Sequence, residues 1–176
     1  MKKLKTSDLN RLSIDEFKQV TKNPFVILLD DIRSAHNIGS AFRTADALCI
    51  EKIYLTGFTA VPPNKEIHKT ALGATDSVSW EYSESGLEVC RRLKEEGYII
   101  VAVEQVAESV LLPEFKLLPE MKLVLVFGNE VHGVSQQIVD FADVCLEIPQ
   151  FGTKHSFNVS VSIGIVLWDL LGKLKV

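Results

Sequence analysis

A chain of 176 residues, 47% of them hydrophobic, is long enough for one globular domain with its own core, and it leaves little room for a second independent domain. Its longest apolar segment, residues 159–171, is interrupted by Ser162, Gly164 and Asp169, and the lysines among residues 1–10 precede no apolar stretch. We therefore expect no membrane anchor, no secretory signal and a cytoplasmic location.

The first element in chain order is a short helix. Residues 13–16, Ser-Ile-Asp-Glu, match a capping box, in which the Ser13 hydroxyl and the Glu16 carboxylate each satisfy a free amide at the helix start. We expect this helix to end near Lys22 and to be stopped by Pro24. Residues 1–23 are accordingly predicted to be a short N-terminal helical segment, and residues 24–176 the main domain.

Strands and helices then alternate along the chain. Apolar runs bounded by turn residues predict buried strands at residues 25–29, 52–55, 98–103, 123–127 and 144–148. Helical patterns lie between them, at residues 40–48, 85–96, 135–141 and 158–171. This alternation predicts an α/β domain with a mostly parallel sheet and helices on both faces.

Three polar segments follow predicted strands, at residues 30–43, 127–133 and 148–160. In parallel sheets ligands bind beyond the carboxyl ends of the strands, so these segments are the candidate binding loops. None contains Gly-x-Gly-x-x-Gly, a Gly-Lys-Ser/Thr phosphate loop or a Gly-x-Ser-x-Gly elbow. The histidines and the three cysteines also lack metal-ligand spacing, so we expect no metal site.

The net charge of −4 is opposite to what binding of a polyanion favours, but the charges are unevenly distributed. Residues 76–147 hold 14 acidic and 5 basic side chains, whereas the rest of the chain holds 9 acidic and 14 basic ones. The basic excess therefore lies in the parts of the chain that contain the first and third segments. Such a distribution is compatible with nucleic-acid binding and also occurs in proteins that bind none.

Together the three segments resemble the SpoU/TrmH branch of the SPOUT methyltransferases. The first contains Asn37-Ile38-Gly39 with Arg43 six residues after the Asn, and the second contains Phe-Gly-Asn-Glu at residues 127–130 with Gly133. The third has Ile148-Pro149 followed by Ser-Phe-Asn-Val-Ser at residues 156–160, where the family more often has Leu in place of Phe157. Residues 69–74 also resemble a family segment, so the likeness covers residues 24–172.

The resemblance implies a C-terminal deep trefoil knot, S-adenosylmethionine as the cofactor and methylation of an RNA ribose 2′-hydroxyl. It favours transfer RNA as substrate, with ribosomal RNA as the alternative, and it implies a homodimer whose sites are completed across the interface. Its motifs assign the catalytic site to Asn37, Arg43, Glu130, Ser156 and Asn158. They assign cofactor binding to Val103, Glu104, Gly128, Ile148 and Phe157.

The identity of the base stays open. The family assigns activation of the hydroxyl to Arg43, yet a guanidinium keeps its proton, which suits Arg43 better to orienting a phosphate and stabilising an oxyanion. Glu130 resembles an ordinary base, but in its family role it fits better as an acceptor for loop amides and a partner Arg.

Purely structural interpretations exist for the same residues. Asn37 fits an N-cap of a helix beginning near Gly39, Arg43 a solvated helix position, Glu130 a first-turn acid, and Ser156 an N-cap of the last helix. At the level of function, the alternatives are a non-catalytic RNA-binding module of the same fold and a small-molecule α/β enzyme such as a hydrolase.

Overall fold

The computed structural model describes residues 1–5 and 8–174. Its seven strands form one sheet in the order β3-β2-β1-β6-β4-β7-β5, and every adjacent pair is parallel. The α/β prediction with a mostly parallel sheet is therefore confirmed. The strands are β1 (Asn23–Asp30), β2 (Ile50–Thr56), β3 (Trp80–Ser83), β4 (Ile99–Val103), β5 (Val110–Leu111), β6 (Leu123–Phe127) and β7 (Val144–Glu147).

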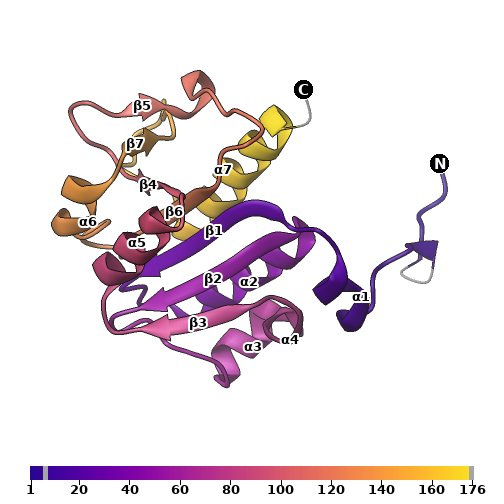
Figure 1. The fold of residues 1–176 in the computed structure, drawn as a ribbon. Helices are drawn as coiled ribbons and strands as arrows, with labels where there is room; N and C mark the ends of the chain where they lie inside the picture. Colours follow the sequence, from indigo (N-terminus) through magenta and orange to yellow (C-terminus); the bar gives the residue numbers. More distant parts are fainter. Residues whose placement is uncertain (6–7, 175–176) are drawn as a thin grey trace.

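Helices cover both faces of this sheet, as expected (Figure 1). Two of them, α5 and α6, lie on one face, and α2 and α7 lie on the other, where α3 and α4 contact α2. The helices are α1 (Ile14–Gln19), α2 (Ala35–Ala47), α3 (Lys65–Ala71), α4 (Ala74–Ser77), α5 (Gly86–Glu95), α6 (Gln136–Phe141) and α7 (Val159–Leu174), with a short 3₁₀ helix, η2 (Leu112–Glu114).

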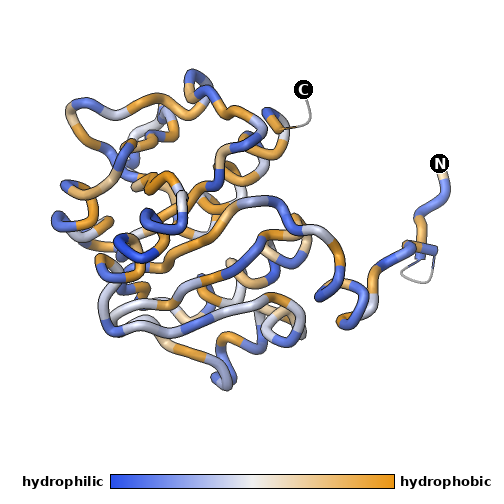
Figure 2. Tube along the Cα trace, viewed as in Figure 1, coloured by the Kyte–Doolittle hydropathy of each residue, from blue (hydrophilic) through white to orange (hydrophobic). Residues whose placement is uncertain are grey.

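The core consists of two apolar clusters separated by the sheet. In β1 the side chains of Phe25, Ile27 and Leu29 join the cluster with α2 and α7, whereas Val26 and Leu28 join the cluster with α5 and α6. Because both faces are covered, the central strands are continuous apolar runs instead of alternating ones. Figure 2 shows these strands as predominantly hydrophobic.

Several predicted boundaries were wrong. Helix α2 begins at Ala35 and not at Ser40, because the Ser34 side chain accepts a hydrogen bond from Asn37 N and caps the helix. The capping box of α1 is confirmed, but this helix ends at Gln19, since the next residue has extended backbone angles. Pro24 lies inside β1, next to a register shift in its pairing with β2.

The N-terminal residues extend away from the sheet, and α1 contacts α4 (Figure 1). The division of the chain at residue 23 stays a prediction, and residues 6–7 and 175–176 of the two predicted segments lie outside the described residues. The trefoil knot also stays a prediction. Among the helices formed by residues 1–5 and 8–174, none has the length and apolar character needed to cross a lipid bilayer.

Candidate active site

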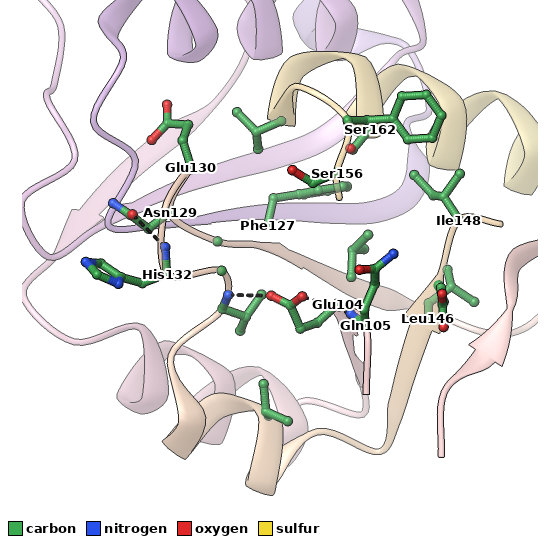
Figure 3. Close-up of a pocket in the computed structure, with 18 of the residues that line it drawn as sticks. Glu104, Gln105, Phe127, Asn129, Glu130, His132, Leu146, Ile148, Ser156 and Ser162 are labelled. Atoms are coloured by element: carbon green, nitrogen blue, oxygen red, sulfur yellow. Dashed lines mark hydrogen bonds between the residues drawn. The ribbon is translucent and has the colours of Figure 1, made fainter. Parts of the chain in front are cut away.

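A cavity of about 640 Å³ lies at the carboxyl ends of β4, β6 and β7 (Figure 3). Glu104 and Gln105 lie on one side of it, and Ser156 and Ser162 lie on the other, in the view of Figure 3. Its lining includes every residue predicted to bind the cofactor, namely Val103, Glu104, Gly128, Ile148 and Phe157, and three of the predicted catalytic residues, namely Glu130, Ser156 and Asn158.

One wall of the cavity is the tight loop between β6 and α6. The backbone groups of Asn129 and Gly133 bond each other in both directions at 2.9 Å. The buried side chain of Asn129 donates to Asp31 O at 2.7 Å and accepts from Val131 N and His132 N at 2.9 and 3.1 Å. The Asn129 side chain therefore holds this loop in a fixed shape beside the cavity.

Both glycines of this loop are required by its geometry. Gly133 has φ +70°, a conformation that side chains with a Cβ rarely adopt. A Cβ on Gly128 would lie only 2.0 Å from the Gly133 carbonyl carbon, so the two ends of the loop approach each other too closely for any other residue.

Two carboxylates hold the end of the loop. Glu104 accepts from Val134 N at 2.9 Å through Oε2 and from Gln105 N at 2.8 Å through Oε1. Asp30, only 5% exposed at the end of β1, accepts from Ser135 N at 3.0 Å. Sequence reasoning placed Asp30 at the start of the first candidate segment but gave it no role, although an acidic residue at the end of an apolar strand was a usable signal.

A hydrogen-bonded chain joins the three motif segments. Glu130 accepts from Asn37 Nδ2 at 2.8 Å, and from the backbone amides of Arg33 and Ser34 at 3.0 and 3.1 Å. Asn158 Nδ2 in turn donates to Asn37 Oδ1 at 3.1 Å. Segments separated by more than ninety residues in sequence are thus fixed against one another by side chains that the motifs had singled out.

The pKa of Glu130 reflects these bonds. Partial burial raises the pKa of this carboxyl, but the hydrogen bonds from Arg33 N, Asn37 and Ser34 N together outweigh burial and lower it below its usual value. Glu130 is therefore a carboxylate at neutral pH and a weak proton acceptor. Its contacts match the predicted role as an acceptor for loop amides.

The structure contradicts three of the purely structural interpretations. Asn37 lies in the first turn of α2, so it is not the N-cap. Glu130 lies in the loop before α6 and not in its first turn. Ser156 lies three positions before the first residue of α7, so it is not the N-cap. Asn158, directly before the helix, accepts a hydrogen bond from Ser160 N through Oδ1 instead. The catalytic assignments of these side chains stay predictions.

Arg43 does not join the cavity of its own chain. It is exposed on α2, and the cavity lining does not include it. Six residues along an α-helix advance about 9 Å and turn about 240°, so Arg43 and Asn37 lie on different faces of α2.

Within residues 1–5 and 8–174, no cluster of His, Cys, Asp and Glu is suited to hold a metal ion.

Comparison with known proteins gives the family. The sequence profile of the SpoU rRNA Methylase family matches residues 24–168. The 23S rRNA (guanosine-2'-O-)-methyltransferase RlmB of Neisseria meningitidis is 33% identical over 157 residues, which are 87% of this chain and 60% of that protein. The tRNA (guanosine(18)-2'-O)-methyltransferase of Aquifex aeolicus is 31% identical over 156 residues, which are 88% of this chain and 72% of that protein.

Solved structures share the fold. The A. aeolicus TrmH/SpoU tRNA modifying enzyme superposes with a TM-score of 0.81 at 28% identity, covering 92% of this chain and 82% of that one. An AdoMet-bound rRNA methyltransferase from Sinorhizobium meliloti gives 0.77 at 26% identity, covering 90% of this chain and 60% of that one. With a profile match over most of its length, this chain belongs to the SpoU rRNA methylase family.

Proposed function

We propose that this protein transfers the methyl group of S-adenosylmethionine to a ribose 2′-hydroxyl of RNA, with transfer RNA preferred and ribosomal RNA as the alternative. The observation that carries the proposal is the bonding of Glu130, Asn37 and Asn158 into one network beside the cavity. Support comes from the relatives, whose names specify guanosine 2′-O-methylation of 23S rRNA or of tRNA.

The cavity suits the proposed cofactor in size and in lining. Its volume of about 640 Å³ falls within the range of about 300 to 1,000 Å³ that is typical of small-molecule sites. Val103 and Ile148 offer apolar surface for a flat adenine, and residues of the loop after β6 line the same cavity. When bound, S-adenosylmethionine supplies an electrophilic methyl group on its sulfonium. The S. meliloti relative was solved with AdoMet bound.

The chain's own residues must position a ribose hydroxyl that loses its proton as it attacks. Glu130 holds the start of α2 in place, and its lowered pKa makes it a weak acceptor for that proton. Ser156 and Asn158, at the cavity, orient the target nucleotide. Arg43 binds a phosphate or the developing oxyanion through its planar fork of donors.

In this proposal the active unit is a homodimer located in the cytoplasm. Val161 and Trp168 are seven residues apart on α7, so their side chains lie on the same face of that helix, and they are 47% and 74% exposed. They leave an apolar surface on α7. Arg43 lies outside the cavity of its own chain, so a second subunit that packs against α2 and α7 would bring an Arg43 to each target ribose. The trefoil knot expected for this family forms part of the same proposal.

The proposal is tested by incubating the protein with methyl-labelled S-adenosylmethionine and RNA from cells that lack the gene. The expected product carries its label in a linkage that resists alkaline cleavage, because a methylated 2′-oxygen cannot attack the neighbouring phosphate. Label in a base, or none, contradicts the proposal. RNA binding without transfer would favour the non-catalytic module, and failure to bind S-adenosylhomocysteine would favour a different α/β enzyme. Separate tRNA and rRNA fractions decide between the two substrates.

A further inference from the structure

The loop between β7 and α7 carries an aromatic side chain that the fold leaves in solvent. Phe151 is 96% exposed, and every residue from 151 to 158 is exposed. A hydrogen bond from Gln150 Nε2 to His155 O at 3.4 Å joins the two ends of the turn that carries Phe151. The ring is therefore held on a short projecting turn and contributes nothing to the core.

This turn lies at the rim of the cavity. Gln150, Ser156, Phe157 and Asn158, which flank the turn on both sides, line the cavity where the proposed methyl transfer takes place. A ligand that extends out of the cavity past Ser156 meets the turn next. The loop is thus placed to contact parts of the substrate that lie beyond the reacting ribose.

The charge of the loop indicates which ligand it fits. Lys154 and His155 lie beside Phe151, and the chain has no acidic residue from position 148 to position 168, although its net charge is −4. Among the ion pairs formed by residues 1–5 and 8–174, none involves Lys154. An exposed ring beside a free cation is the combination that binds single-stranded nucleic acid, with the ring stacked on a base and the cation on a phosphate.

A protein partner is the competing occupant, and the composition of the turn disfavours it. Cores of protein interfaces are apolar and depleted in Lys, whereas the residues after Phe151 are Gly, Thr, Lys and His. The apolar surface on α7, with Val161 and Trp168, fits a second subunit better.

We propose that Phe151 stacks on an unpaired nucleobase of the substrate RNA next to the target ribose, and that Lys154 binds a phosphate of the same strand. This inference rests on the proposed function and deepens it. It makes the 150–158 loop a specificity-determining surface that selects target nucleotides in single-stranded segments. Phe151 acts on the RNA and does not itself line the cavity.

The test compares four forms of the full-length protein, namely wild type, Phe151→Ala, Phe151→Leu and Phe151→Tyr, on RNA from cells that lack the gene. Both Ala and Leu should raise the KM for RNA by about 5- to 150-fold, which is the range for loss of one stacked base. Tyr should restore KM, since it retains a flat ring. The affinity for S-adenosylhomocysteine and the kcat at saturating RNA should change little.

Lys154→Gln should lower the slope of log affinity against log salt by about 1, as loss of one phosphate contact predicts. Lys116→Gln, which removes the same charge from an exposed position between η2 and β6, is the matched control and should leave the slope unchanged.

Three results would overturn the inference. An unchanged KM in Phe151→Ala shows that the ring does not contact RNA. A KM that Leu restores as well as Tyr shows that general apolar contact suffices. Dissociation of Phe151→Ala into monomers in sedimentation shows a subunit contact. If wild type binds RNA in a Phe151-dependent way but transfers no methyl group, the proposed function fails and this inference stands.

Discussion

Glu130→Gln is the sharpest test of the network that joins the motifs. The carboxylate accepts three hydrogen bonds, from Arg33 N, Ser34 N and Asn37 Nδ2. Gln keeps the shape of the side chain but replaces one acceptor oxygen with an NH₂ group, which must then face a donor. At least one of the three bonds is lost, and the others lose the assistance of the charge.

The magnitude follows from that count. A hydrogen bond contributes about 0.5 to 1.5 kcal/mol net, and Glu130 is an exposed residue, so we expect a loss of about 1 to 2 kcal/mol of unfolding free energy. For a domain of this size such a loss lowers Tm by about 2 to 8 °C. Thermal unfolding followed by circular dichroism at pH 7 measures it. Glu120→Gln, which removes an exposed carboxylate from a turn before β6, is the control and should leave Tm unchanged.

The effect should also depend on pH. The pKa of Glu130 is lower in the folded protein than its usual value of 4.5, so the unfolded chain takes up this proton first as the pH falls. The contribution is therefore complete above pH 4.5 and is lost as the pH falls through the lowered pKa. The Tm difference between wild type and Glu130→Gln should shrink there. Equal Tm values for Glu130→Gln and Glu120→Gln at pH 7 would refute the reasoning, as would a difference that persists in acid.

Three further predictions concern the cofactor and the chemistry. S-adenosylhomocysteine at a hundred times its Kd should stabilise the protein by about 2.7 kcal/mol and raise Tm by about 5 to 11 °C, whereas NAD and ATP should give no shift in the same thermal assay. Arg43→Ala should abolish methyl transfer and leave the Kd for S-adenosylhomocysteine unchanged in calorimetry, since Arg43 does not line the cavity. Arg43→Lys should be nearly as inactive at every pH, and recovery of activity as the pH rises would instead indicate a proton-accepting role. Asn158→Ala removes the hydrogen bonds to Asn37 and Ser160. It should raise the Kd for S-adenosylhomocysteine about 5-fold or more in calorimetry and also lower the rate of methyl transfer. An unchanged Kd would contradict this.

The parts of the fold that could be predicted are those whose sequence pattern follows from burial alone. Strands β1, β4 and β6 lie at the centre of the sheet and are apolar on both faces, so their sequences are continuous hydrophobic runs. The missed strands β3 and β5 lie at the two edges and have four and two residues. Their extended conformation depends on pairing with β2 and β7, which a local pattern does not reveal.

The start of α2 was missed for a different reason. Gly39 and the polar residues before it were interpreted as a loop, yet Gly39 lies inside the helix. A Cβ there would lie 2.1 Å from Thr70 Oγ1 and 2.3 Å from Ile67 O, so glycine is needed for the close approach of α3 to α2. A glycine that serves helix packing is indistinguishable in sequence from one that serves a turn.

At the site, the sequence motifs identified the residues around the cavity but not the forces that shape it. Glu104 was predicted to bind the cofactor, and it lines the cavity, but its carboxylate is bonded to Val134 N and Gln105 N. The role of Asp30 could not be predicted, because its partner Ser135 N lies more than a hundred residues away in sequence. Such pairings depend on the order of strands in the sheet, which no single motif specifies.

That strand order explains why three polar side chains converge on one loop. Asp30, Glu104 and Asn129 each follow or end a different parallel strand, namely β1, β4 and β6, which are neighbours in the sheet. Their carboxyl ends therefore meet at one edge, and each side chain there bonds backbone amides of the loop between β6 and α6. Because these side chains accept hydrogen bonds from its amides, the loop holds its shape without a ligand. The geometry of this loop therefore requires glycine at positions 128 and 133, whereas Val131 and His132 are exposed.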